Sequence, residues 1–596
     1  MAPSPNVSAE GVMRITVSSN GTKLPETVGL VSVTVSRAAN AIPFARLVVA
    51  DGDMAAQLFP VGDGELFKPG SAITIKAGYQ DEESTIFEGI VVRQGLKITG
   101  QNFSRLVIEC RDKAAVMTVG RKNANYVDQK DSDILSTLFS DAGLATDIGA
   151  TALQHKELVQ YYCTDWDFAI ARAEANGMLV VVTDGKAVVK VPDMSAASAL
   201  SVTYGIDLIE FDADIDARSQ LASAQGFAWD PKTQATIQGT AATPPSLNKQ
   251  GDLKGSDLAK VLGVETYRLQ TPAPLESASL KTWADAQQLK AGLARVRGRM
   301  KFQGSALAQV GGLIDLAGVG TRFSGSVFVT AVDHELTDGN WWTQVEFGMS
   351  PMWFTQRADV QGPSAAGLLP GVEGLQIGVV MKLDADPEGE QRVQVSVPVM
   401  QAETDGVWAR LAQLHASDGF GTFFVPEIGD EVLLGYLNND PSYPVILGSV
   451  YSSKRKPPYE LTAQNNIKAV VTRCKSKIEF NEEDKIITVL TPAGNTIVLS
   501  DKDKSILMKD QNNNKVELNP SGITLDSPKD ILVTAKGTIT LDAVGAVTVT
   551  SKSNVKTSGL NVDCVAQVGF SAKGAATAEL SATGQTTVKG ALVMIN

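Results

Sequence analysis

The chain has 596 residues, of which 43% are hydrophobic and 20% charged, and its formal net charge at pH 7 is −13. This length suits about four domains, and the composition is that of a globular chain. The acidic balance argues against a nucleic acid as partner, and no apolar run approaches the ~20 residues that a membrane helix requires.

The chain also lacks the usual signals of export and of metal binding. Residues 1–20 contain no basic segment followed by an apolar one, so we expect no signal peptide. The cysteines form no CxxC pair, and the histidines number only three. We therefore expect a reducing compartment, no disulfide framework, no metal and no cofactor. These residues are Cys110, Cys163, Cys474, Cys564, His155, His334 and His415.

Strands are predicted first, and then helices. Alternating apolar residues indicate strands at 31–35, 72–76 and 106–109. Helical spacing follows at 132–139, and a second helix begins near Thr164, where Thr164 and Asp167 fit a capping box and Gly177 fits the C-terminal stop.

The next part of the chain mixes strands with one long helix. Strands are predicted at 179–182, 187–191, 326–330 and 344–347, with a polar loop over 240–255. A stripe at steps of three and four predicts a helix from about Leu280 to Met300. The stripe consists of Trp283, Ala286, Leu289, Leu293, Val296 and Met300.

A Gly- and Ala-rich linker at 361–371 precedes five short strand candidates. Five strands in about 75 residues with glycine-rich turns predict a small closed barrel of the OB kind. The candidates are Ile377–Leu383, Arg392–Val397, Val407–Leu414, Glu431–Leu437 and Pro444–Val450.

Beyond a second break at 452–458 the chain becomes repetitive. Strands alternate with turns at 481–484, 492–495, 501–504 and 511–514. After Pro520 an eight-residue period appears, in which Ile531, Ile539, Val547 and Val555 share one position. A ribbon of such short strands has no second layer to bury its apolar side. We expect several chains to wind together into a prism; the alternative is a single-chain solenoid.

Several stretches resemble the hub and spike proteins of contractile injection machines: VgrG proteins of type VI secretion, phage tail hub–spike proteins and spikes of extracellular contractile injection systems. The resemblance is carried by Tyr161–Gly177 (YYCTDWDFAIARAEANG), Trp408–Leu411 (WARL), Gly419–Leu433 (GFGTFFVPEIGDEVL), Asn439–Tyr451 (NDPSYPVILGSVY), Thr491–Asn495 (TPAGN) and Val588–Asn596 (VKGALVMIN).

This resemblance implies a mainly β fold with some α. It would contain two tube-like β-barrel hub subdomains plus helices, an OB-fold barrel and a C-terminal intertwined trimeric β-helix or β-prism. The expected domains are a first hub barrel (1–125), a helical or mixed insertion (126–195), a second hub subdomain (196–360), a linker (361–376), the OB barrel (377–451), a linker (452–466) and the spike (467–596).

The resemblance further implies a structural homotrimer that adapts a hexameric inner tube to a threefold needle. Its partners would be the inner tube protein, baseplate proteins, a PAAR-type tip protein and effector cargo, and it would touch a target membrane only during injection. It would be assembled in the bacterial cytoplasm, in a particle released from the cell or anchored to its membrane. The stretch Ile42–Met54 looks more like the spikes of extracellular systems and their close type VI relatives. The apolar end would dock the tip protein through Leu592, Val593, Met594, Ile595 and Asn596.

The residues that suggest chemistry have simpler explanations. Asp165 and Asp167 fit a helix N-terminus better than an acid–base pair. His334-Glu335 is followed by Asp338 where a zinc motif needs a histidine. His415 has no ligand neighbour, and Lys454–Lys456 fits a solvated turn. No catalytic residue is therefore predicted, and the chain is expected not to be an enzyme. The alternatives are a tail-associated cell-wall hydrolase and a trimeric glycan-binding tailspike or adhesin.

Overall fold

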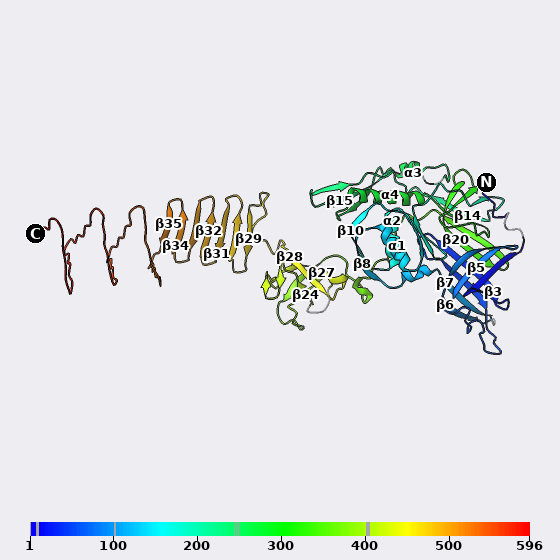
Figure 1. Cartoon of the computed structure of the whole chain (residues 1–596), viewed down its shortest axis with the longest axis horizontal. Coiled ribbons are helices and arrows are strands. Elements are labelled where there is room, and N and C mark those ends of the chain that lie inside the picture. Colours follow the sequence, from blue (N-terminus) through cyan, green and yellow to red (C-terminus); the bar gives the residue numbers. More distant parts are fainter. Residues whose placement is uncertain are drawn as a thin grey trace. The chain divides into compact units, whose positions relative to one another are not determined.

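The computed structural model describes residues 2–6, 11–100, 103–243, 245, 247, 249–400 and 406–595. The chain divides into two compact units, Met1–Val450 and Tyr451–Asn596, whose elements are labelled in Figure 1. Across the described ranges, no helix has both the length and the apolar character needed to cross a membrane.

The first unit begins with a group of antiparallel strands around one apolar core. Alternation drives their pairing, because Val33, Val35, Leu47 and Val49 all point inward and are fully buried. The predicted strands at 31–35, 72–76 and 106–109 are confirmed within this group. Its strands are β1 (Met13–Ser19), β2 (Thr22–Lys23), β3 (Gly29–Ala38), β4 (Phe44–Ala50), β5 (Ala72–Tyr79), β6 (Glu82–Thr99) and β7 (Phe103–Arg111).

A helical insertion follows, with its own core. Both predicted helices are present as α1 (Asp131–Asp141) and α2 (Asp165–Ala175). Thr164 Oγ1 accepts a hydrogen bond from the Asp167 N–H at 3.0 Å, and Gly177 adopts a φ of +66° just beyond the helix end, a conformation that suits glycine. The other elements are η1 (Lys113–Thr118), β8 (Lys122–Lys130), β9 (Ala145–Ile148), β10 (Gln154–Cys163), β11 (Leu179–Thr183) and β12 (Lys186–Lys190).

A second strand group continues the sheet of the first. The order β14-β18-β21-β20-β3-β4-β7-β6-β5-β1-β2 runs through both groups, which join where His334 of β20 pairs with Val35 of β3. The second group has its own core around Met300, Phe302 and Phe347. Its strands are β13 (Leu200–Thr203), β14 (Glu210–Ile215), β18 (Val296–Gln303), β19 (Leu313–Ala317), β20 (Gly325–Thr337) and β21 (Asn340–Phe347).

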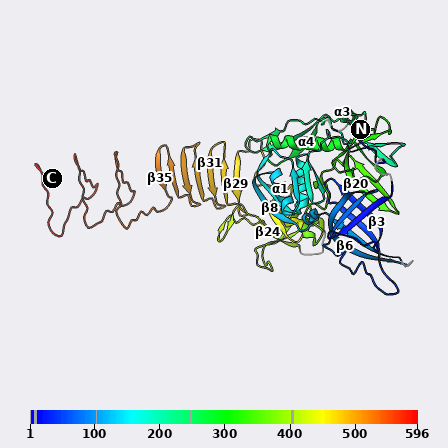
Figure 2. The same ribbon diagram turned by 45° about the vertical axis from the view of Figure 1, so that its right-hand side comes forward.

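The long helix is shorter than predicted. α4 covers Ser277–Leu293 and packs on α2, which is labelled beneath it in Figure 1. Figure 2 shows α4 above α1 after the molecule is turned. Val296 and Met300, which the sequence placed on its apolar stripe, lie instead on β18. There Val296, Met300 and Phe302 alternate inward with period two, and pairing with β14 and β21 overrides the helical spacing. α4 contacts β15 (Ala224–Asp230) and β16 (Ala235–Gln238). The remaining elements of this part of the chain are α3 (Gly255–Leu262), β17 (Tyr267–Thr271), η2 (Phe354–Gln356) and η3 (Ser364–Gly367).

The five strand candidates that follow the linker form a closed barrel, as predicted. Its strands pair in the order β22-β23-β24-β28-β27 around a core that includes Val380, Val395 and Leu434. The strands are β22 (Gln376–Lys382), β23 (Val393–Ser396), β24 (Val407–Leu411), β27 (Glu431–Tyr436) and β28 (Pro444–Ser449), with η4 (Pro398–Met400), β25 (Ala416–Ser417), β26 (Phe420–Gly421) and η5 (Leu437–Asn439) between them.

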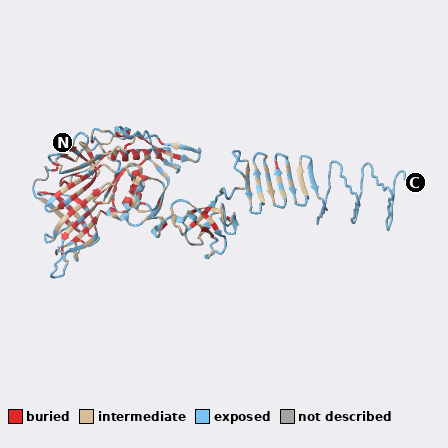
Figure 3. Ribbon diagram, turned by 180° about the vertical axis from the view of Figure 1, so that it is seen from behind, coloured by how far each residue is buried: buried red, intermediate tan, exposed pale blue. Residues whose placement is uncertain are grey.

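The second unit is a single antiparallel meander in which every strand pairs with the next. Each predicted turn lies between two strands, so this part of the pattern is confirmed. Figure 3 shows how sharply burial differs between the units, because this one is almost entirely intermediate or exposed. The strands are β29 (Ile467–Val471), β30 (Lys477–Asn481), β31 (Ile486–Leu490), β32 (Thr496–Ser500), β33 (Ser505–Lys509), β34 (Lys515–Asn519) and β35 (Gly522–Asp526).

Candidate assembly surfaces

One side of the second unit carries two continuous columns of apolar side chains. The strand registers place Ile497 opposite Met508 and Leu499 opposite Ile506, and the same arrangement repeats along the meander. Many of these side chains are about two-fifths exposed, for example 40% for Ile497 and 45% for Met508, and the exposure rises to 59% at Leu525 and 74% at Ile523. The columns comprise Val470, Ile478, Phe480, Ile487, Val489, Ile497, Leu499, Ile506, Met508, Val516, Leu518, Ile523 and Leu525.

The opposite side of the same sheet is mixed and carries the charges. Lys477 pairs with Glu479 at 2.6 Å, and Lys515 pairs with Glu517 at 3.2 Å. These pairs stand on the same strands as apolar column residues but point the other way, because side chains alternate across a strand. One side of this sheet is therefore apolar, and the other is mixed and carries the charges.

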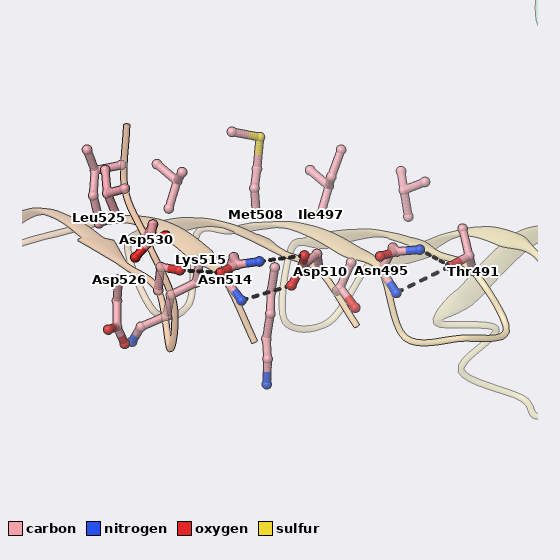
Figure 4. Close-up of a pocket in the computed structure, with 16 residues that line it drawn as sticks. Thr491, Asn495, Ile497, Met508, Asp510, Asn514, Lys515, Leu525, Asp526 and Asp530 are labelled. Atoms are coloured by element: carbon pink, nitrogen blue, oxygen red, sulfur yellow. Dashed lines mark hydrogen bonds between the residues drawn. The ribbon is translucent and has the colours of Figure 1, made fainter. Parts of the chain in front are cut away.

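Figure 4 shows the edge of the apolar side, where a groove of about 600 Å³ lies between columns and turns. Ile497, Met508 and Leu525 project to one side, while the turns below are held by short side chains. Asn495 donates to Thr491 Oγ1 at 3.1 Å, and Asn514 donates to Asp510 at 2.8 Å. These bonds recur nineteen residues apart, a period that our sequence analysis missed although Ile478, Ile497 and Val516 also show it.

The octad segment continues the columns. Eight residues after Ile523 and Leu525 come Ile531 and Val533, and the chain bends again at roughly eight-residue intervals. Beyond Asp526 the described part of the chain forms no further strands with itself. Its apolar residues are exposed, with Ile539 at 52% and Val549 at 70%. A single copy thus supplies the repeat but not the partners that its backbone and side chains need.

In the first unit a buried ion pair joins α2, α4 and η2. Glu174 Oε1 accepts from Lys290 Nζ at 2.7 Å, and Glu174 Oε2 accepts from the Phe354 N–H at 2.8 Å. Lys290 also lies 5.3 Å from the Trp353 ring centroid. The adjoining cavity measures only about 10 Å³, which is too small for a substrate, so the pair holds helices together.

A second buried carboxylate, Asp131, begins α1. It accepts hydrogen bonds from Arg172, His155 and Asn176, the Arg172 contact being 2.7 Å. Burial alone would raise the pKa of Asp131, but these hydrogen bonds and the Arg172 charge outweigh burial and lower it. The sequence analysis missed both carboxylates; a charged residue inside or directly before an apolar helical stripe is the signal that marks them.

The structure gives the sequence-predicted chemical residues separate local surroundings on α2, on β20 and in two turns. Asp165 pairs with Lys122 at the start of α2, in keeping with a helix N-terminus. His334 is buried, with Nδ1 3.0 Å from Thr343 Oγ1, and burial lowers its pKa to about 3. His415 is exposed beside Phe420. The turn at 454–456 is exposed. No group of three or more potential metal ligands occurs in the described ranges.

The predicted tip-docking residues stay an untested prediction. Leu592, Val593, Met594 and Ile595 are exposed, from 48% for Val593 to 93% for Ile595. Asn596 lies outside the described residues.

Known proteins resemble this chain in three segments. Residues 9–338 match the Alg8 N-terminal domain, residues 376–451 match the type VI secretion system/phage-baseplate injector OB domain, and residues 486–553 match the phage baseplate V C-terminal trimerisation domain.

Individual relatives match over shorter lengths. The type VI secretion system spike protein VgrG1b of Pseudomonas aeruginosa is 34% identical over 134 residues, 20% of this chain and 18% of that protein. The actin cross-linking toxin VgrG1 of Vibrio cholerae is 32% identical over 19% of this chain and 11% of that protein. The chain thus spans about a fifth or less of the curated relatives it matches. A 43 kDa prophage tail protein from Shewanella oneidensis aligns with a TM-score of 0.44 at 12% identity, over 57% of this chain and 98% of that one.

The closed OB barrel and these matches support a VgrG-type spike of the type VI secretion and phage baseplate class. Because the Alg8 N-terminal domain match covers more than half of the residues, the chain belongs to that family.

Proposed function

We propose that three copies of this chain form the hub and puncturing spike of a contractile injection machine. The observation that carries the proposal is the pair of apolar columns, which one copy leaves uncovered while the other side of the same sheet bears the charges. Three such sheets, with their columns turned inward, bury one another and leave Lys477, Glu479, Lys515 and Glu517 in water. The trimerisation-domain match over residues 486–553 supports three as the number.

The first unit would then work as an adapter between a hexameric inner tube and the threefold spike. Its two joined strand groups, each with a separate core, offer two similar contact faces per copy and therefore six per trimer. The proposal includes two hub regions at 1–125 and 196–360 with an insertion at 126–195, the barrel at 377–451 and the spike at 467–596, with linkers at 361–376 and 452–466. Its partners would be the inner tube protein, baseplate proteins and effector cargo. The work is mechanical and requires no catalysis; the buried carboxylates found here hold helices.

The exposed stretch Leu592–Ile595 would dock a PAAR-type tip protein by apolar contact. Removing residues 592–596 should abolish tip binding while the trimer persists. Normal tip binding by the shortened chain would refute the assignment.

Light scattering on the full-length protein tests the oligomeric state directly. A mass near three times 63.0 kDa is expected. A folded monomer would overturn the proposal, since the apolar columns would then be exposed in the working molecule.

A further inference from the structure

Two stretches of the long sheet in the first unit have a strand partner on one side only: β14, at one end of the strand order, and the far part of β6, which extends beyond its neighbour β5 (Figure 1). β14 pairs only with β18, through the register Glu210↔Lys301 to Ile215↔Val296. β6 pairs with β5 as far as Ile90, and from there to Thr99 it pairs with β7 alone. Residues 92–99 therefore present backbone groups that another strand can bond.

The outward row of β14 is acidic. Glu210, Asp212 and Asp214 alternate with inward residues and are exposed. Lys301 and Arg299 on β18 lie 3.9 and 3.5 Å from the first two carboxylates. Asp214 forms no ion pair with any described residue. The row therefore keeps capacity for cations on its open side.

The outward row at the other free edge is basic. Arg93 and Lys97 of β6 and Arg46 of β4 line a groove of about 470 Å³. Within the described ranges these three cations have no carboxylate partner. Arg111, in the same groove, is already held by Glu109 at 2.6 Å.

The two charged rows lie on the same face of the sheet. The registers run from Asp212 across β18, β21 and β20 to Arg46 on β4 and Arg93 on β6, and these residues are all on the solvent side. When two such sheets join edge to edge with this face continuous, the acidic row of one copy meets the basic row of the next.

The inward rows at the same two edges are apolar and incompletely covered. Phe211, Ala213 and Ile215 of β14 are only half-buried, and Leu96 and Ile98 of β6 are 49% and 64% exposed. Other exposed apolar side chains also flank these edges, namely Phe103, Tyr204, Ile206 and Ile209. At both places, side chains on the inner and on the outer side of the sheet are therefore left uncovered where a further strand could pair.

We propose that β14 of one copy pairs with residues 92–99 of β6 in a second copy, with acidic and basic rows opposed on the outer face and apolar rows joined beneath. This inference rests on the proposed trimer and names the surfaces that join its first units. Because the two edges differ, the contact is head-to-tail, and it closes into a ring only when the rotation between copies completes a circle. A continuous sheet with no free edge at these positions results.

Hydrogen exchange on the full-length protein tests this pairing, read on peptides that cover 92–99 and 210–215. In the trimer, the backbone N–H groups of 92–99 and 210–215 that lack a partner within one copy should exchange at least tenfold more slowly than unpaired backbone amides. Asp212→Lys with Asp214→Lys should remove that protection from both peptides. Adding Arg93→Glu and Lys97→Glu should restore the protection, because the reversed charges on β14 then face reversed charges on β6. Glu26→Lys, an exposed change with a charge reversal of the same kind, should leave both peptides protected.

The outcomes separate this inference from the proposed function. A trimer by light scattering whose edge amides exchange freely, or in which the four-residue charge exchange fails to restore protection, overturns the edge pairing and leaves the spike intact. A monomer overturns both.

Discussion

The two units of this chain solve the burial problem in opposite ways. In Met1–Val450, apolar residues close on one another within the copy, and side chains such as Phe67, Phe139 and Phe302 are fully buried. In Tyr451–Asn596, equally apolar columns stay open along one side of a sheet. The hydrophobic effect acts on both, and in the proposed trimer the open unit finds its missing layer in other copies. One chain thus combines a body that buries its own core with a sheet that the proposed trimer would complete.

The largest effect should come from a charge placed in the open columns. Leu499→Asp puts three carboxylates into the proposed interface, where an unpaired charge is strongly unfavourable. We expect the trimer mass to fall to that of a monomer in light scattering. Thr488→Asp, on the opposite side of the same meander, should leave the trimer intact. Equal behaviour of the two variants would contradict the assignment of the apolar side as the surface that joins the copies.

The buried pair in the first unit should matter to stability and not to assembly. Glu174→Ala leaves Lys290 buried and unpaired, and we expect a loss of about 3–5 kcal/mol in the free energy of unfolding. Denaturant-induced unfolding of the first unit measures this loss. Glu65→Ala, which removes the exposed pair with Lys68, should cost at most about 1 kcal/mol. A change in oligomeric mass with Glu174→Ala would show that the units are not independent.

His334 should make the first unit sensitive to mild acid. Burial lowers its pKa from 6.5 to about 3, so between these values the unfolded chain binds a proton that the folded chain does not. The stability of the fold with neutral His334 is therefore fully present above pH 6.5. As the pH falls towards 3, the free energy of unfolding decreases by up to about 1.4 kcal/mol per pH unit. Denaturant melts at pH 7 and pH 5 should show it. His334→Gln should flatten that part of the pH profile, and an unchanged profile would contradict a buried neutral histidine.

The smallest expected effect is at the start of α2. Thr164→Ala removes the hydroxyl that accepts from the Asp167 N–H, and we expect a loss of about 1 kcal/mol. Thermal unfolding of the first unit measures it, and Thr164→Ser should retain most of the stability. A loss as large as that of Glu174→Ala would mean that Thr164 does more than cap the N-terminus of α2.

Local patterns in the sequence identified many elements correctly. The Thr164 cap and the Gly177 stop marked α2, and glycine-rich turns marked the barrel strands, because capping and left-handed turns are local chemistry. The eight-residue period predicted an incomplete layer, since alternation alone tells which side of a strand is apolar. Local patterns failed at Val296 and Met300, where helical spacing and strand alternation both fit and sheet pairing decided.

What the sequence determined by itself was therefore the repeats, the caps, the barrel strands and the resemblance to a spike, all of which depend on neighbours along the chain. Only the tertiary structure brought Glu174 to Lys290 across 116 residues, joined β3 to β20 in one sheet, and left β14 and residues 92–99 of β6 with a strand partner on one side only. These features depend on which distant strands pair, and the free energy of such pairing belongs to the folded arrangement rather than to any short stretch of sequence.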